Sequence, residues 1–379
     1  ADQPPRRAVG TDAMKLLVVN TPVGSLGSGR GGGVERTLVS LVAGLLDRGH
    51  SVTVLAAAGS VLPPRAQRAE LWLETGSDQP SWQHQNRDAP VQIPADSLLS
   101  ALWQRALHEQ HQFDVLLNLG YDWLPLWLTP ITTTPLAHLI SMGSVSTAMD
   151  QLIARIGSSH PEHLAFHSAN QAADFALQRQ PILLGNGFDL ERYHFCANPH
   201  DQLGWAGRIA PEKGLEDAAA AAAALGLPLV VMGLKEDPTY AARVEASVPA
   251  GTLIWRGFLE ADALQAELGR CRALINTPKW NEAFGNVVVE AMACGVPVAS
   301  YARGGPAELV VEGRNGALAA PDDVNALIAA SQRALTIERR SCRDWAEQHC
   351  SMAGFAERVE AWLAGLICSA AQEPKPQNR

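Results

Sequence analysis

Two short apolar runs around one amphipathic segment constrain the fold of this chain most. The runs are MKLLVVN, from Met14 to Asn20, and HSVTVLAAAG, from His50 to Gly59. Between them, VERTLVSLVAGLLDRG carries apolar residues at helical spacing and ends at Gly49. Short, continuously apolar runs are typical of strands buried on both faces, and a strand–helix–strand order joins parallel strands. The sequence therefore predicts a parallel sheet covered by helices.

The pattern of strands and helices continues along the chain and starts afresh near residue 190. Further strands are expected at 113–120, 135–143, 203–209, 227–233, 252–258, 272–278 and 296–301, and further helices at 98–110, 214–226, 286–295 and 322–335. A chain of 379 residues is long enough for two domains. We therefore predict an α/β protein with two doubly wound, Rossmann-like domains.

The limits of the domains follow from this pattern. Residues 1–13 are predicted to be a disordered tail, residues 14–189 the first domain and residues 190–345 the second. The stretch 346–379 is predicted to be a C-terminal helix that returns toward the first domain, followed by a tail. Residues 61–94 are rich in Pro, Gln and Trp and are expected to form an irregular insertion.

The composition narrows the classes of partner. The formal net charge of −9 argues against nucleic acid, because phosphate backbones attract basic surfaces. The six cysteines form no C-x-x-C pair, so neither a zinc site nor a small disulfide framework is predicted. The polar start has no apolar signal-peptide core, and no apolar run has the length of a membrane span. We therefore expect a cytoplasmic protein.

A glycine-rich stretch from Gly27 to Gly32, GSGRGG, matches the pattern G-x-G-x-x-G. We do not infer a nicotinamide dinucleotide site, because about a dozen residues separate Asn20 from the helix and the second strand ends without an acid for the ribose. Two interpretations remain open. One is a mobile surface loop, and the other is a loop whose Gly32 and Gly33 amides approach a sugar or phosphate.

Two cations follow a predicted strand of the second half. In GRIAPEKG, Arg208 ends the strand and Lys213 begins the next helix. Ligands of doubly wound sheets bind outside the carboxyl ends of the strands, where both cations are expected. An arginine and a lysine at such an edge suit a diphosphate. The alternative is a pair of solvated surface cations.

The segment from Trp280 to Val298 places two glutamates on either side of a turn. Glu282 is expected in the loop after a strand, and Glu290 about one turn inside the next helix. A carboxylate in the second position can accept hydrogen bonds from both ribose hydroxyls, and a helix N-terminus favours a phosphate. Each glutamate alone is also compatible with a solvated acid. Together, their spacing predicts a site for the sugar, phosphate and ribose of one nucleotide sugar.

These motifs as a set resemble one known family. NEAFGNVVVEAMACGVPV is similar to the E-x7-E signature of the retaining GT-B glycosyltransferases, the glycogen-synthase-like class. GNGFD, GRIAPEKG, IWRGFL, GGPAELVVEGRNGAL and GGGVER resemble other segments of that family in the same order, from Lys15 to about Leu318. The resemblance implies the GT-B fold, in which two Rossmann-like domains face a cleft. It also implies that the C-terminal domain binds the donor and the N-terminal domain the acceptor.

The resemblance further implies roles for single residues. Arg208 and Lys213 are expected to bind the donor diphosphate, Glu290 the ribose, and Glu282 the reacting face of the donor sugar. His138 is expected to touch the donor sugar, with a packed strand histidine as the alternative. Other donor contacts are implied at Phe284, Gly285, Asn286, Arg256, Phe258, Gly32 and Gly33. No Asp-x-Asp motif is present where a donor diphosphate would need a metal, so neither metal nor cofactor is expected.

Within the family, the stretch TPVGSLGSGRGGGVE resembles enzymes that glucosylate tetrahydrobiopterin. This implies transfer of glucose from UDP-glucose to a small acceptor as an α-glucoside. Trp123 is then the candidate for stacking on a pterin, with ordinary packing as the alternative. Two other functions stay open. One is a hexosyltransferase acting on a sugar or lipid-linked acceptor, and the other is a non-catalytic nucleotide-sugar-binding protein, in which loss of Glu282 or Lys213 would be expected.

Overall fold

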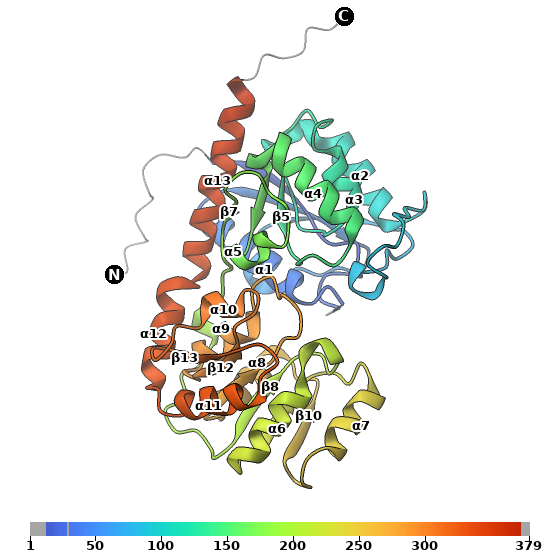
Figure 1. Ribbon diagram of the computed structural model, residues 1–379. Coiled ribbons are helices and arrows are strands. Elements are labelled where there is room, and N and C mark those ends of the chain that lie inside the picture. The colour runs from blue at the N-terminus through green and yellow to red at the C-terminus, as the bar shows by residue number, and fades with distance from the viewer. Residues whose placement is uncertain (1–12, 29, 373–379) are drawn as a thin grey trace, which may run out of the picture. The chain divides into compact units, whose positions relative to one another are not determined.

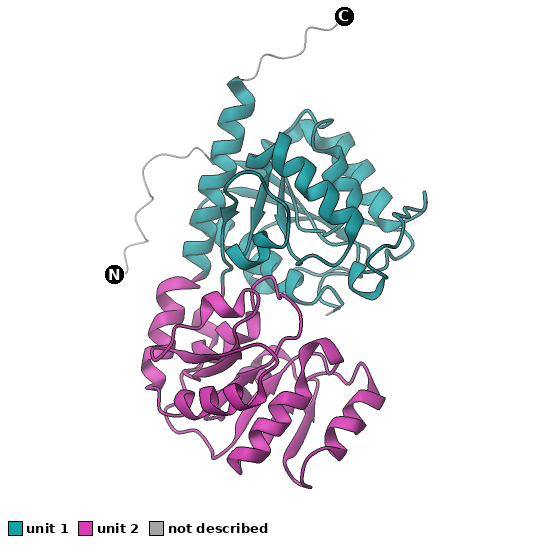
Figure 2. Ribbon diagram, viewed as in Figure 1, with its two compact units in different colours: residues 1–187, 352–379 teal, residues 188–351 magenta. Residues whose placement is uncertain are grey.

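The computed structural model describes residues 13–28 and 30–372, which form two compact units (Figure 2). Unit 1 comprises residues 1–187 and 352–379, and unit 2 residues 188–351. The chain returns from unit 2 to unit 1 after Ser351, six residues beyond the predicted end of the second domain at 345. The reason is that α12 (Arg339–His349) packs Cys342, Trp345 and Ala346 into the core of unit 2. The predicted tails at 1–12 and 373–379 lie outside the described residues.

Unit 1 is built on a seven-stranded parallel sheet with the strand order β3-β2-β1-β4-β5-β6-β7 (Figure 1). The strands are β1 (Lys15–Val19), β2 (Ser51–Ala57), β3 (Glu70–Glu74), β4 (Val115–Asn118), β5 (Leu136–Ile140), β6 (Leu164–Phe166) and β7 (Ile182–Leu183). Its helices are α1 (Gly33–Asp47), α2 (Leu98–Glu109), α3 (Trp123–Leu128), α4 (Thr147–Ser159), α5 (Ala169–Ala173) and α13 (Met352–Gln372).

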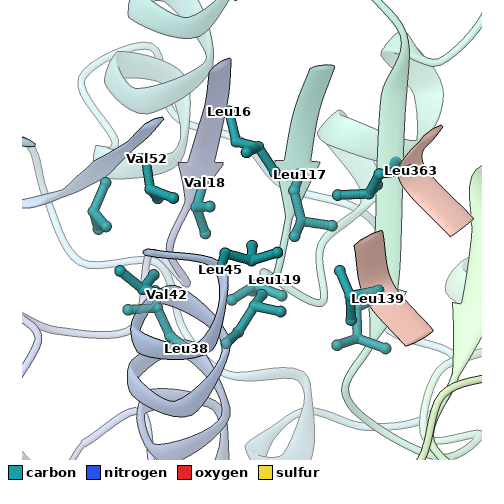
Figure 3. Packing of buried hydrophobic residues seen from close by; sticks show 14 of the residues in the cluster. Leu16, Val18, Leu38, Val42, Leu45, Val52, Leu117, Leu119, Leu139 and Leu363 are labelled. Carbon is teal, nitrogen blue, oxygen red and sulfur yellow. The ribbon is translucent and has the colours of Figure 1, made fainter. Parts of the chain in front are cut away.

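The two faces of this sheet are covered by different helices. Leucine and valine side chains of α1 and α13 pack with Leu16, Val18, Leu117 and Leu139 on one face (Figure 3). The other face packs against α2 to α5. Side chains alternate between faces along a strand, which is why nearly every residue of the central strands is apolar.

Unit 2 is built on a six-stranded parallel sheet with the strand order β10-β9-β8-β11-β12-β13. The strands are β8 (Leu203–Ala206), β9 (Leu229–Met232), β10 (Leu253–Gly257), β11 (Ala273–Asn276), β12 (Val298–Tyr301) and β13 (Gly316–Ala319). Besides α12, its helices are α6 (Leu215–Leu225), α7 (Pro238–Ala246), α8 (Ala261–Gly269), α9 (Asn286–Ala293), α10 (Pro306–Leu309) and α11 (Val324–Ala334).

The prediction of two doubly wound α/β domains is confirmed, and one local prediction is wrong. The segment 61–94, predicted as irregular, contains the edge strand β3, paired with β2. Its residues, ELWLE, mix two glutamates with half-exposed apolar side chains. An edge strand needs no continuous apolar run, so this strand lacked the signal that marked the buried ones.

Each sheet has a crossover point at which the chain changes direction across the sheet. In unit 1 this point lies between β1 and β4, and in unit 2 between β8 and β11. Because all strands of a sheet are parallel, their carboxyl ends meet at one edge. Ligands of doubly wound folds bind at this edge, next to the crossover point.

The two places at which the chain passes between the units are neighbours. Phe188 forms a parallel bridge with Ser351, and its backbone N–H donates to the carbonyl of Cys350 at 2.9 Å. The first and last residues of unit 2 are therefore adjacent in space.

Candidate functional site

At the carboxyl edge of the unit 2 sheet, Gly207 and Gly233 present backbone without side chains; we call this surface the floor of bare backbone. The N–H of Gly207, after β8, donates to Met232 O at 3.0 Å, and the N–H of Gly233, after β9, donates to Gly257 O at 2.8 Å. A Cβ on Gly233 would lie 1.8 Å from the carbonyl oxygen of Gly207, so only glycine fits there. Gly233 was missed by the sequence analysis, although the glycine that ends VVMG was a usable signal.

Lys213 and Glu282 are joined at this edge. The lysine Nζ forms an ion pair with the Glu282 carboxylate, and both side chains are largely buried. The same Nζ lies 5.2 Å from the centre of the Trp280 ring, a cation–π contact. Because Lys213 reaches Glu282 from the loop after β8, the loops at the crossover point are linked through these two charges.

Arg208, the second predicted cation, lies at the end of β8 and is about one-third exposed. Its guanidinium pairs with Glu212 at 3.0 Å and with Glu236. The structure therefore places both cations at the carboxyl edge, each held by carboxylates of unit 2.

The loop that carries Glu282 is fixed by a second loop after β12. The N–H of Gly305 donates to the Glu282 carbonyl at 2.7 Å. Gly304 has φ +62°, and a Cβ there would lie 2.6 Å from the Glu282 nitrogen. Gly285, with φ +100°, approaches Pro306 in the same way, its Cβ falling 2.8 Å from the proline Cγ. Close packing of these two loops thus determines where the Glu282 backbone lies.

Helix α9 begins at Asn286, immediately after Gly285, so Glu290 lies one turn inside it. Glu290 is 3% exposed, and the Tyr193 hydroxyl donates to its Oε1 at 3.3 Å. Phe284 is buried and stacks on Phe188 with ring centres 6.4 Å apart. Its side chain belongs to the core, so any contact it makes with a donor must come from its backbone.

The ends of β9 and β10 expose apolar side chains. Phe258 is 63% exposed and follows Gly257, whose φ of +69° turns the chain at the end of β10. Leu234 follows Gly233 on the neighbouring strand and is 61% exposed. Arg256 is exposed and pairs with Glu267 at 3.5 Å. Apolar surface is therefore available beside the floor of bare backbone.

The remaining predicted residues belong to unit 1. In the glycine loop, the N–H groups of Gly27 and Gly31 donate to the two carboxylate oxygens of Glu35 at 2.9 and 2.7 Å. Gly32 has φ +55° and caps α1, which starts at Gly33. The loop is therefore held by a carboxylate of its own helix. Gly29 lies outside the described residues.

His138 lies in the middle of β5 and cannot touch a sugar, so this prediction is wrong. The residue is 0% exposed, its Nδ1 lies 3.1 Å from the Asn118 amide and its Nε2 2.8 Å from the Thr129 hydroxyl. Burial lowers the pKa of the imidazole to about 3, with a smaller contribution from His163. The ring is therefore a neutral, fully hydrogen-bonded part of the core. Because β5 continues to Ile140, His138 lies inside the strand and not at its end.

Trp123 is the first residue of α3, at the carboxyl side of β4. It is half-buried and stacks on Trp127, with ring centres 5.9 Å apart and planes inclined by 19°. Trp127 is 42% exposed and lines a surface hollow of about 860 Å³ together with Ile131 and Arg155. One face of Trp123 is thus covered, and Trp127 offers more free ring surface.

Asp122, which precedes Trp123, was missed by the sequence analysis. It is 3% exposed and accepts a hydrogen bond from the Trp82 indole at 3.2 Å. Burial raises the pKa of its carboxyl to about 7. A single acid after a strand gave no sequence signal for such an environment.

Two features are absent from the residues that the structure describes. No group of three or more His, Cys, Asp or Glu side chains is placed there to hold a metal ion. Within the same residues, no helix combines the length and apolar character needed to cross a membrane.

Residues 199–350 match the family Glycosyl transferases group 1. The D-inositol 3-phosphate glycosyltransferase of Geodermatophilus obscurus is 25% identical to this chain, over 99% of this chain and 93% of its own length. The 2-deoxystreptamine N-acetyl-D-glucosaminyltransferase of Streptomyces fradiae is 35% identical over 36% of this chain and 34% of its own.

Among solved structures, Anabaena Alr3699/HepE in complex with UDP and glucose is similar to the whole fold. It covers 93% of this chain and 99% of its own, with a TM-score of 0.70 and 20% identity. At this identity the similarity shows a shared fold, whereas the family match lies within unit 2.

Proposed function

We propose that this enzyme, a glycosyltransferase of the GT-B fold with a group 1 region at residues 199–350, transfers glucose from UDP-glucose to a small hydroxylated acceptor with retention of configuration. One observation carries the proposal. At the carboxyl edge of the unit 2 sheet, Lys213 is ion-paired with Glu282, and Glu290 lies one turn inside the helix that follows. This edge therefore combines a cation with two carboxylates, which we assign to the diphosphate, the donor sugar and the ribose.

The donor diphosphate is assigned to Arg208 and Lys213. Both cations are now paired with carboxylates. An ammonium has three N–H donors and a guanidinium five, so phosphate oxygens can bind both cations while these pairs persist. As the glycosidic bond breaks, negative charge grows on the leaving diphosphate, and preorganised cations stabilise it. The glycines of the floor, Gly207 and Gly233, let a ligand approach the backbone closely. No metal is needed for these steps.

The ribose and the base are assigned to neighbouring parts of the same edge. Glu290 is a buried acceptor that can take hydrogen bonds from both ribose hydroxyls. The backbone around Arg256 and Phe258 is assigned to the base, with exposed apolar side chains beside it. UDP and glucose are the molecules bound by the structural neighbour HepE, which supports this choice of donor.

Retention is assigned to attack on the donor face from which UDP leaves. A carboxylate ion-paired with lysine is a weaker nucleophile, because its charge is partly neutralised. Glu282, held by Lys213 and by the Gly304–Gly305 loop, is therefore better suited to orient the sugar than to bond to it. The leaving phosphate then accepts the proton of the attacking hydroxyl.

Two kinds of acceptor are proposed. Tetrahydrobiopterin follows from the N-terminal resemblance, and the Trp123–Trp127 pair is the aromatic surface available for it in unit 1. A cyclitol follows from the relatives, since both inositol phosphate and 2-deoxystreptamine are hydroxylated six-membered carbocycles. A sugar or lipid-linked acceptor is the alternative within the same reaction.

The test is an assay of the purified full chain with UDP-glucose and one acceptor at a time. Released UDP is quantified, and mass spectrometry identifies the glucoside, whose α-linkage is checked by NMR. Trp123→Ala and Trp127→Ala should raise the acceptor KM for a pterin and leave the donor KM unchanged. UDP-glucose binding without hydrolysis or transfer to any acceptor would instead mean a non-catalytic nucleotide-sugar-binding protein.

A further inference from the structure

Two polar side chains at the carboxyl edge of the unit 1 sheet are buried without a hydrogen-bond partner. Asn20, directly after β1, is 1% exposed, and neither its amide nitrogen nor its amide oxygen is bonded. The hydroxyl of Ser141, directly after β5, is also buried and unbonded. Within the part of the chain that the structure describes, no other side chain has two such atoms.

Leaving a buried amide unbonded is unfavourable, because it loses its hydrogen bonds to water and gains none in return. Asn118, at the end of β4, shows how a buried amide at this edge is ordinarily satisfied. It is 2% exposed, and its side chain forms hydrogen bonds with Gly120 and with His138. The lack of partners at Asn20 and Ser141 is therefore a local feature that calls for an explanation.

Both unbonded side chains lie on the same face of the sheet. Along β1, Leu16 and Val18 pack with α1, and alternation places Asn20 on that face as well. Along β5, Ala137 and Leu139 belong to the same core cluster, which α1 and α13 cover, and alternation places Ser141 on that face too. The strands β1 and β5 flank β4, at the crossover point of the sheet.

The spacing of the two groups suits a small polyol. Neighbouring strands lie about 4.8 Å apart, so the ends of β1 and β5 are separated by roughly 10 Å. An amide and a hydroxyl on one face at this separation can hold hydroxyl groups on the two sides of one six-membered ring or of a short diol chain. An amide both donates and accepts, as a neutral hydroxyl group does.

The charge at this place points to a neutral ligand. The N-terminus of α1 favours an anion, and the carboxylate of Glu35 already fills that role by accepting from Gly27 and Gly31. Glu35 is 8% exposed, so its charge is poorly screened. A phosphorylated ring would add a second anion beside it.

We propose that Asn20 and Ser141 form the acceptor subsite and bind two hydroxyl groups of a neutral polyol. This inference rests on the proposed function, since it names the chemical class of the acceptor. Both tetrahydrobiopterin, through its dihydroxypropyl chain, and myo-inositol belong to the class, whereas D-inositol 3-phosphate does not. The two residues hold the acceptor and take no part in bond breaking.

The test compares Asn20→Leu and Ser141→Ala with the matched control Asn118→Leu. Transfer from UDP-glucose is measured in separate arms with tetrahydrobiopterin, myo-inositol and D-inositol 3-phosphate. In an arm that supports turnover, Asn20→Leu should raise the acceptor KM about tenfold and leave the donor KM within about twofold. Ser141→Ala should act in the same direction, and the phosphorylated ring should be the poorer acceptor.

Thermal unfolding gives a second readout that needs no acceptor. Because Asn20→Leu removes an unbonded buried amide, its Tm should rise by about 2–4 °C, whereas Asn118→Leu should unfold at a lower temperature than the wild type. If Asn20→Leu does not fold, Ser141→Ala decides. Its acceptor KM must rise while its Tm does not fall.

The outcomes separate the two proposals. An unchanged acceptor KM in both variants, or a wild-type preference for D-inositol 3-phosphate, would overturn the subsite while the glycosyltransferase reaction stands. Hydrolysis of UDP-glucose with refusal of both neutral acceptors would do the same. Failure of the wild type to bind or hydrolyse UDP-glucose would instead overturn the proposed function.

Discussion

Replacing Gly304 by alanine should impair catalysis without touching any charged group. The new Cβ would lie 2.6 Å from the nitrogen and 2.7 Å from the carbonyl oxygen of Glu282. Real Cβ atoms essentially never come this close to other heavy atoms, and both neighbours here are backbone. The Glu282 segment must therefore move by several tenths of an ångström or more.

The effect of Gly304→Ala has two parts, a loss of stability and a loss of rate. Alanine at φ +62° costs roughly 1–2 kcal/mol, because its Cβ disfavours the left-handed region. Displacing Glu282 adds a catalytic loss, for which a misplacement of about 1 Å corresponds to roughly 10²-fold in rate. We therefore expect Gly304→Ala to lower kcat by roughly 10- to 10²-fold.

Gly313→Ala is the matched control. Gly313 also lies in unit 2 and has φ +74°, but a Cβ there meets nothing within 4 Å. It should show a similar backbone penalty in thermal unfolding and keep wild-type turnover. Both variants are compared by glucosyl transfer at saturating donor and by Tm. Equal kcat values for the two alanine variants would refute the argument that this loop positions Glu282.

The remaining predictions concern charge, metal and pH. Arg208→Ala and Lys213→Ala should each reduce kcat by about 10²–10³, since each removes a charge aimed at the leaving diphosphate; near-wild-type rates in both would contradict this assignment. Glu290→Gln should chiefly raise the donor KM and Glu282→Gln chiefly lower kcat, and kinetics with varied donor would expose a reversal of the two roles. Activity should survive EDTA, and loss that Mg²⁺ or Mn²⁺ restores would disprove metal independence. The lowered pKa of His138 keeps it neutral in the folded chain while the unfolded chain takes up a proton below pH 6.5, so its contribution to stability is lost as pH falls from 6.5 toward 3. His138→Gln should flatten this part of the pH dependence in urea unfolding, and an unchanged profile would show that another group causes it.

The fold and the placement of the charged motifs at one sheet edge could be predicted because both depend on local sequence. Buried parallel strands such as β1 and β11 are continuous apolar runs, and a parallel sheet brings their carboxyl ends together whatever the details of packing. This suffices to bring Arg208, Lys213, Glu282 and Glu290 to one edge. Edge strands and isolated histidines carry no such signal, which explains the errors at Glu70–Glu74 and His138.

The partners of the site residues could not be predicted, because they depend on contacts between distant positions. Lys213 and Glu282 are 69 residues apart in the sequence, and no pattern indicated that they pair. Asn20 and Asn118 look alike in sequence, each a polar residue at the end of an apolar run. Only the tertiary structure distinguishes the bonded amide from the unbonded one.

The bridge between Phe188 and Ser351 has a consequence for how this enzyme can be recombined. Since unit 2 is one uninterrupted stretch of chain whose first and last residues are neighbours, a coding segment for 188–351 can be exchanged as a cassette. The exchange cuts no strand pair of either sheet. Chimaeras with the corresponding segment of a structurally similar glycosyltransferase should therefore fold, as insertion of domains with adjacent ends generally permits. The sequences of the two units can then be varied independently, each in its own segment of the gene.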